Sequence, residues 1–102
     1  MVVHDDDVPI GMGGWRRYGD DGVGELKRMY VRESARGRGI ARLLLAHLER
    51  TAAESGIRRL VLETGVEQPE AIALYRSAGY VDVPSFGYYI DHEDSVYLGK
   101  DL

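Results

Sequence analysis

The stretch Glu25-Leu-Lys-Arg-Met-Tyr-Val-Arg-Glu-Ser-Ala-Arg-Gly-Arg-Gly-Ile-Ala41 decides the fold of this chain. Its first half alternates apolar and polar residues imperfectly, with Leu26, Met29 and Val31 apolar, and this pattern predicts a strand over residues 24–31. A basic, glycine-rich turn follows, and a helical pattern begins at Ile40. A strand, turn and helix start in this order presents backbone N–H groups and positive charge to one anion, most plausibly a diphosphate.

The turn itself carries the residues that such an anion needs. Gly37 and Gly39 let the backbone approach oxygens that a Cβ would block, and Arg36 and Arg38 add charge-assisted hydrogen bonds. The turn is not a P-loop, because no Gly-Lys-Ser/Thr follows, and it is not a dinucleotide fingerprint, because Arg42 stands where a small residue is required. Taken alone, it could equally be a basic helix N-terminus on a loop.

Working outward, the remaining pattern predicts an α/β or α+β domain with a mixed sheet. The first helix runs from Ile40 to an end at Gly56, with its leucines in the core, and the second runs over residues 69–78 and ends at Gly79. The other predicted strands are residues 2–4, 9–17, 58–64, 80–83 and 96–100, with a weaker candidate at 87–90.

Composition narrows the class of protein. The 102 residues and 44% hydrophobic content suffice for one domain, 1–102, with one core. The absence of cysteine excludes disulfides and a thiolate metal site, and it suits the cytoplasm. A net charge of −4 argues against nonspecific nucleic-acid binding, no apolar run reaches membrane-spanning length, and no His and carboxylate pair has convincing metal spacing. We therefore expect no nucleic-acid partner, no membrane segment and no metal.

Three segments of the chain match the motifs of one known family in the family's order, and together they are a more specific signal than the glycine turn alone. Arg36-Gly-Arg-Gly-Ile-Ala41 fits the Arg/Gln-x-x-Gly-x-Gly/Ala signature of the GCN5-related N-acetyltransferases, and the strand before it resembles that family's fourth strand. Ala71-Ile-Ala-Leu-Tyr-Arg-Ser-Ala-Gly-Tyr80 resembles the family's Ala-x-x-Leu-Tyr-x-x-x-Gly-Phe segment, with Tyr in place of the final Phe. The resemblance covers about residues 8–102.

The resemblance implies a mixed, mostly antiparallel twisted sheet with two flanking helices. Family members normally begin with a first strand and two helices, whereas Met1 here is followed almost at once by what resembles the second strand. We therefore expect the first strand and first two helices to be lacking. Acetyl-coenzyme A is the implied cosubstrate, bound where two central strands splay apart. The residues implied to contact it are Met29, Tyr30, Val31, Arg36, Gly37, Arg38, Gly39, Ile40 and Ala41.

The resemblance also implies catalytic roles. Tyr75 occupies the position of the family's general acid, with its hydroxyl near the coenzyme sulfur; the alternative is a core aromatic with a hydrogen-bonded tip. Glu25, eleven residues before Arg36, matches a glutamate that serves as general base in the histone-acetylating branch; the alternatives are a glutamate on the solvent side of a strand and one that merely attracts a cation.

The function that follows is transfer of an acetyl group from acetyl-coenzyme A to a primary amine of a small molecule, peptide or protein by direct attack. The alternative from another class is a noncatalytic coenzyme A-binding or interaction module that has lost its acceptor site. A small domain with an uncovered sheet face should recruit a partner, so we also expect a homodimer.

Overall fold

The computed structural model describes residues 2–5, 8–19, 22–31, 39–66, 68–84 and 94–102. Six strands form one sheet in the order β1-β2-β3-β4-β6-β5, in which β3 and β4 are parallel and every other neighbouring pair is antiparallel. The strands and helices are β1 (Val2–Asp5), β2 (Val8–Arg17), β3 (Val23–Val31), α1 (Ile40–Glu54), β4 (Arg59–Gly65), α2 (Pro69–Ser77), β5 (Val81–Asp82) and β6 (Ser95–Asp101). This is the mixed, mostly antiparallel sheet with two helices that the sequence predicts.

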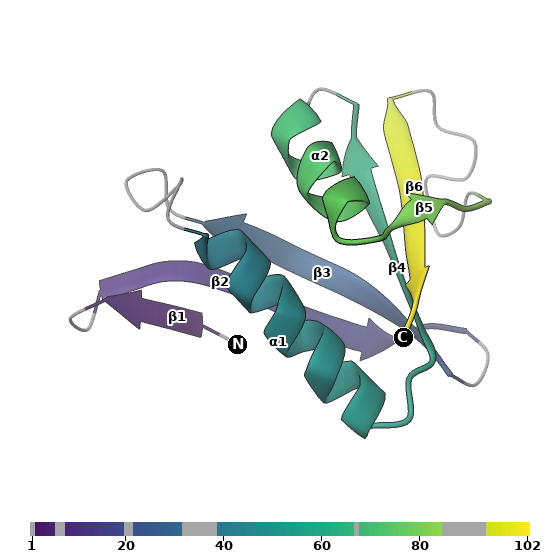
Figure 1. The fold of residues 1–102 in the computed structure, drawn as a ribbon, viewed down its shortest axis with the longest axis horizontal. Helices are drawn as coiled ribbons and strands as arrows, with labels where there is room; N and C mark the ends of the chain where they lie inside the picture. The colour runs from purple at the N-terminus through teal and green to yellow at the C-terminus, as the bar shows by residue number, and fades with distance from the viewer. Residues whose placement is uncertain (1, 6–7, 20–21, 32–38, 67, 85–93) are drawn as a thin grey trace.

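The two parallel strands at the centre of the sheet separate. Pairing between β3 and β4 is confined to Val23–Glu25 against Arg59–Val61. Beyond these pairs the strands diverge, as Figure 1 shows. The sheet therefore has a first arm, made of β1, β2 and β3 with α1, and a second arm, made of β4, β6 and β5 with α2.

A β-bulge interrupts β3 on the first arm. Met12 pairs with Tyr30 and Gly14 pairs with Lys27, so Arg28 and Met29 together oppose the single residue Gly13. The extra residue reverses the alternation along β3. This is why the apolar pattern of the sequence looked imperfect there.

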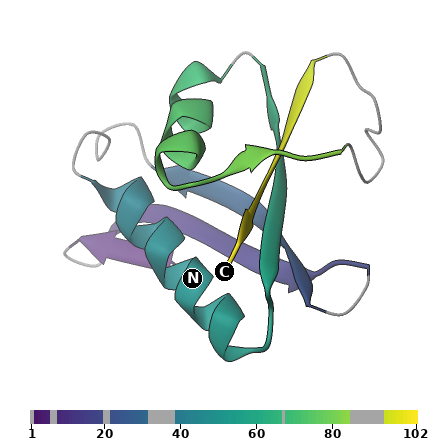
Figure 2. The same ribbon diagram turned by 45° about the vertical axis from the view of Figure 1, so that its right-hand side comes forward.

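Both helices pack on the same face of the sheet, which we call the helix face (Figures 1 and 2). Its core contains Leu26 from β3, Leu44 and Leu48 from α1, Leu60 from β4 and Tyr75 from α2. We call the opposite side of β1, β2 and β3 the open face. Cross-strand pairs share a face, so Arg16 with Glu25, Gly14 with Lys27 and Met12 with Tyr30 lie on it.

The burial of the leucines on α1 differs from the prediction at one position. Ile40, Leu44, Leu48 and Ala52 form a buried stripe at four-residue steps, as expected, and Leu45 joins it. The placing of every leucine of this helix in the core was wrong for Leu43, whose exposed fraction is 63%. At about 100° per residue, Leu43 lies on the opposite side of the stripe from Leu45.

The helix ends follow the predicted stop signals. Gly56 and Gly79 adopt the left-handed conformation, with φ of 87° and 99°. Such positive φ angles favour glycine, which has no Cβ to clash. The weaker strand candidate at 87–90 lies outside the described residues.

Candidate active site

The first component of the site is the N-terminus of α1. Gly39 is its N-cap residue, with φ 74° and ψ 11°, and the amide of Leu43 donates to the Gly39 carbonyl at 3.0 Å. Glycine provides no side chain to cap the first-turn N–H groups, and the first turn carries no acidic residue. These amides, those of Ile40 and Ala41 included, are suited to an anion. Arg36, Gly37 and Arg38 lie outside the described residues.

The second component is the edge of β3 that has left β4. Residues from Leu26 to Val31 have no pairing with β4. The bulge at Arg28 and Met29 lies in this segment, and Met29 packs against the helix-face core. Backbone groups at such an edge are suited to pairing with an extended ligand. The predicted backbone contacts of Met29, Tyr30 and Val31 thus fall on the diverging segment, while the Tyr30 side chain is on the open face and 54% exposed.

Tyr75 lies on α2, which accompanies the part of β4 that has left β3 (Figure 1). Its side chain is buried in the helix-face core, the same core against which Met29 packs. No hydrogen bond from its hydroxyl is found to any residue that the structure describes. Burial raises the pKa of Tyr75 to about 12, so the phenol keeps its proton at neutral pH.

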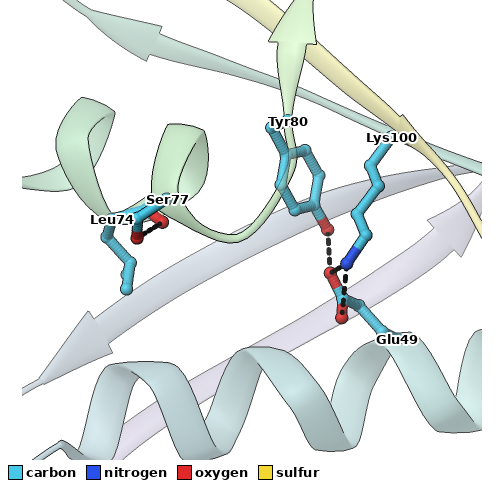
Figure 3. Close-up of polar contacts among 5 residues, drawn as sticks. All are labelled: Glu49, Leu74, Ser77, Tyr80 and Lys100. Carbon is cyan, nitrogen blue, oxygen red and sulfur yellow. Dashed lines mark hydrogen bonds and ion pairs between the residues drawn. The ribbon is translucent and has the colours of Figure 1, made fainter.

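The ring of Tyr80 packs against the ring of Tyr75. The two rings meet edge to face, with centroids 5.6 Å apart and planes at 66°. The Tyr80 hydroxyl donates to Glu49 Oε2 at 2.9 Å, and Lys100 Nζ lies 3.2 Å from the same oxygen, as Figure 3 shows. Burial, and then the neighbouring Glu49 carboxylate, raise the pKa of Tyr80. Because Glu49 is on α1 and Lys100 on β6, this network joins the two arms.

Glu25 lies at the other side of the sheet, where β3 is about to leave β4. It is 6% exposed and points to the open face. Its Oε1 is 3.3 Å from an Arg16 guanidinium nitrogen and its Oε2 is 3.1 Å from Lys27 Nζ. Both carboxylate oxygens therefore already contact a cation. To accept a proton from a substrate, the carboxylate would have to exchange one of these contacts.

The structure thus brings Tyr75 and Met29 into one core and separates Glu25 from them. Tyr75 belongs to the helix face and Glu25 to the open face, on either side of the divergence. An acid and a base placed this way could serve the leaving group and the attacking amine from opposite sides. Sequence reasoning did not find the bulge, the Glu49–Tyr80–Lys100 network or the cations on Glu25. The broken alternation in β3 was a signal for the bulge.

Among the described residues, no three His, Asp or Glu side chains gather in a way that could hold a metal ion. Within the same ranges, neither helix is long and apolar enough to cross a membrane.

Comparison with known proteins agrees with this geometry. Residues 1–80 match the family model described as the acetyltransferase (GNAT) family. An IAA acetyltransferase of Azospirillum brasilense is 39% identical over 102 residues, which are 100% of this chain and 67% of the relative. An uncharacterized N-acetyltransferase, YjcF, of Bacillus subtilis is 35% identical over 78% of this chain and 54% of its own length.

Solved structures show the same fold. A structure described as an acyl-CoA N-acyltransferase from Klebsiella pneumoniae superposes with a TM-score of 0.91 at 34% identity, over 99% of this chain and 70% of that one. An acetyltransferase from Elizabethkingia anophelis with acetyl-CoA bound gives a TM-score of 0.84 at 21% identity, over 99% and 74%.

The chain belongs to the GNAT acetyltransferase family, a family of acyltransferase enzymes. This membership confirms the resemblance drawn from the motifs, and it supports acetyl-coenzyme A as the cosubstrate. The chain spans 67% and 54% of the lengths of the two relatives described above.

Proposed function

We propose that this protein transfers an acetyl group from acetyl-coenzyme A to a primary amine by direct attack of the amine on the thioester. The observation that carries the proposal is the divergence of β3 and β4, with the bulged edge of β3 on one side and buried Tyr75 beside the other. The pantetheine arm would pair with Met29, Tyr30 and Val31, and the diphosphate would bind the turn that ends at Gly39 and the first amides of α1.

Each residue has a role that its surroundings support. A main-chain N–H near Met29 would donate to the thioester oxygen as it gains negative charge. Tyr75 would donate its proton, or a hydrogen bond, to the departing thiolate, and its protonated state at neutral pH fits that role. Glu25 would accept a proton from the attacking amine after one of its two cation contacts is exchanged.

The noncatalytic alternative is favoured by one observation, the engagement of both Glu25 oxygens by cations. A coenzyme-binding module without a base would keep the turn and the β3 edge and lack turnover.

Calorimetric titration with acetyl-coenzyme A tests the coenzyme site first. We expect micromolar binding that Arg36→Ala/Arg38→Ala abolishes, because the double substitution removes two charges from the turn. A folded protein that does not bind would contradict the proposal. Release of free thiol in the presence of a panel of amines then tests transfer, and binding without thiol release from any amine would favour the noncatalytic alternative.

Location and assembly complete the proposal. We propose that the enzyme works in the cytoplasm, which the absence of cysteine suits. We also propose a homodimer, supported by the edge strand β5, whose Val81 side chain is 60% exposed. Sedimentation velocity over a wide concentration range checks it, and a monomer throughout would overturn it.

A further inference from the structure

A groove on the open face of the first arm is distinct from the divergence between β3 and β4. It is open to solvent, has a volume of about 540 Å³ and is lined by Val2, Met12, Gly13, Gly14, Trp15, Arg16 and Lys27. This volume is in the range of small-molecule sites. The groove runs over β1 and β2 and reaches the edge of β3 that pairs with β2, which is the edge opposite β4.

One end of the groove is apolar, and the backbone of β2 at its base is not covered by a side chain at Gly14. Val2 and Met12, which pair across β1 and β2, are 47% and 40% exposed. Gly14 follows on the same strand face, and a Cβ at Gly14 would meet no atom within 4 Å. A ligand could therefore lie directly on the backbone of β2 with an apolar group over Val2 and Met12.

The other end of the groove is cationic. Arg16 and Lys27 are the charged residues that line it, and both contact the buried Glu25 carboxylate. Two cations against one anion leave a net charge of +1 on these three residues. Arg16 uses two of its five N–H donors on Glu25, and within the described part of the chain the other three have no partner. The side chains of Arg16 and Lys27 are 63% and 45% exposed, so a ligand can reach them.

The groove adjoins the bulge. Lys27 lies two residues before Met29, about 7 Å along the strand at the usual rise. Met12, at the apolar end, pairs with Tyr30 on the other side of the bulge. A ligand in the groove therefore has the cationic end, the apolar end and the bulged segment of β3 on three sides.

We propose that this groove binds the acetyl acceptor as an α-amino acid with an apolar side chain. The inference rests on the proposed function for the transfer step. The carboxylate binds Arg16 and Lys27, the side chain lies over Val2 and Met12, and the amine points across β3 toward the bulge. These three substituents of one carbon match the three directions of the site.

Charge excludes the competing acceptors. A polyamine or an amino-acid amide brings only positive charge to the cationic end and leaves the Arg16 donors without an anion. The same positive charge favours the neutral amine over the ammonium, and the neutral amine is the form that attacks the thioester. When the neutral amine attacks, its nitrogen forms the new bond to the acetyl carbon and the carbon–sulfur bond breaks. Tyr75 gives its proton to the departing thiolate, the nitrogen loses its extra proton to Glu25, and proton transfer through water from Glu25 to Tyr75 restores both groups.

Binding of L-leucine and L-leucinamide to the coenzyme A-saturated protein tests the groove without any need for turnover. The two probes differ only in the carboxylate. We expect ligand-observed NMR titration to give leucine roughly 10- to 100-fold tighter binding than leucinamide, since charge-assisted hydrogen bonds are lost with the carboxylate. Equal or tighter binding of leucinamide, or no leucine binding at millimolar concentration, would overturn the proposal.

Substitution of Arg16 and Lys27 tests whether these two residues cause the preference for leucine over leucinamide. Arg16→Gln/Lys27→Gln should reduce the leucine preference to within about twofold of leucinamide, with circular dichroism confirming the fold. Arg50→Gln/Arg59→Gln is the matched control, because it removes two exposed cations outside the groove and should keep the preference. A preference that survives the first variant, or falls equally in the control, contradicts the proposal.

Turnover with leucine, leucinamide and spermidine separates this inference from the proposed function. Thiol release with leucine at the highest kcat/KM supports both. Thiol release with spermidine or leucinamide at a higher kcat/KM than with leucine supports the proposed acetyl transfer and overturns the proposal that the groove binds an amino acid. Release with none of the amines counts against the proposed function, and the binding titration alone then decides the groove.

Discussion

The two faces of β2 and β3 are built from the same strands and have opposite chemistry. On the helix face, Leu26, Met29 and Trp15 pack against α1 in a core that is nearly all hydrocarbon. On the open face, Glu25, Lys27 and Arg16 form ion pairs beside Gly14 and a groove. The bulge at Arg28 and Met29 is the point where the strand changes which residues go to which face.

The difference between the two faces shows that the residues that stabilise the fold and the residues available for ligand binding lie on opposite sides of the sheet. Apolar burial on the helix face stabilises the sheet, whereas ion pairs of the exposed Arg16 and Lys27 side chains with Glu25 contribute less. The open face is therefore available for a charged ligand with little effect on folding. Tyr75 is the exception, because it is a proposed catalytic group inside the helix-face core.

The largest effect should come from the helix face. Leu44 is fully buried, so Leu44→Ala should lower the free energy of unfolding by about 2–5 kcal/mol through lost burial and a cavity. Urea denaturation measures it. Lys27→Gln on the open face is the comparison and should change the same quantity by about 1 kcal/mol or less, because the buried Glu25 carboxylate keeps its contact with Arg16. Similar losses in the two variants would contradict the division between the faces.

Tyr75→Phe should affect turnover far more than folding. It removes the hydroxyl and keeps the ring against Tyr80. We expect kcat to fall about 100-fold, as for loss of a general acid, with the acetyl-coenzyme A affinity within about twofold of wild type. Steady-state kinetics and calorimetry measure the two. Tyr18→Phe, one residue beyond the end of β2, is the hydroxyl-deletion control. Unchanged kcat in Tyr75→Phe would remove this residue from the mechanism.

Alkaline pH should destabilise the helix face through the same hydroxyl. The folded pKa of Tyr75, about 12, is above the ordinary value of 10.0, so the unfolded chain loses this proton first as the pH rises. The contribution is fully present below pH 10, falls between pH 10 and 12, and amounts to about 2–3 kcal/mol. Urea denaturation of wild type minus Tyr75→Phe isolates it. A difference independent of pH across this window would show that Tyr75 is not desolvated.

The smallest of these effects concerns Tyr80. Tyr80→Phe restores the residue of the family segment and removes the hydrogen bond to Glu49. We expect a loss of about 1 kcal/mol in the free energy of unfolding, because the ring stays buried and Glu49 keeps Lys100. A double-mutant cycle with Lys100→Met measures the coupling. Additive losses would mean that the three residues do not act as one network.

Much of the fold could be predicted from local pattern. Glycines at Gly56 and Gly79, Pro69 at the start of α2 and the four-residue stripe of α1 each fix an element through chain geometry, and the structure agrees with each. The choice between Leu43 and Leu45 depended on where the sheet lies relative to the stripe, and the helical period alone leaves this open. The bulge follows from pairing with β2, which joins residues far apart in sequence.

The candidate site was predictable only in part. The family segments predict roles for Tyr75 and for the turn before α1, and these stay predictions; the structure adds what surrounds Tyr75. Arg16 reaches Glu25 through the register of β2 against β3, so no spacing within the sequence indicated it. The contact between Glu49, Tyr80 and Lys100 likewise needs α1, the end of α2 and β6 to be packed together.

The short pairing between β3 and β4 also bears on how the chain folds. Each arm is a continuous half of the sequence, with residues 2–54 in one and residues 59–101 in the other. Most strand pairing therefore closes loops within one half, and only Val23–Glu25 must find Arg59–Val61 across the boundary. Short loops cost little entropy to close and favour fast folding. The divergence that opens a place for a coenzyme thus leaves the shared helix-face core, more than strand pairing, to hold the two halves together. The joint at residues 55–58 is therefore a natural place to divide the chain into two complementary fragments.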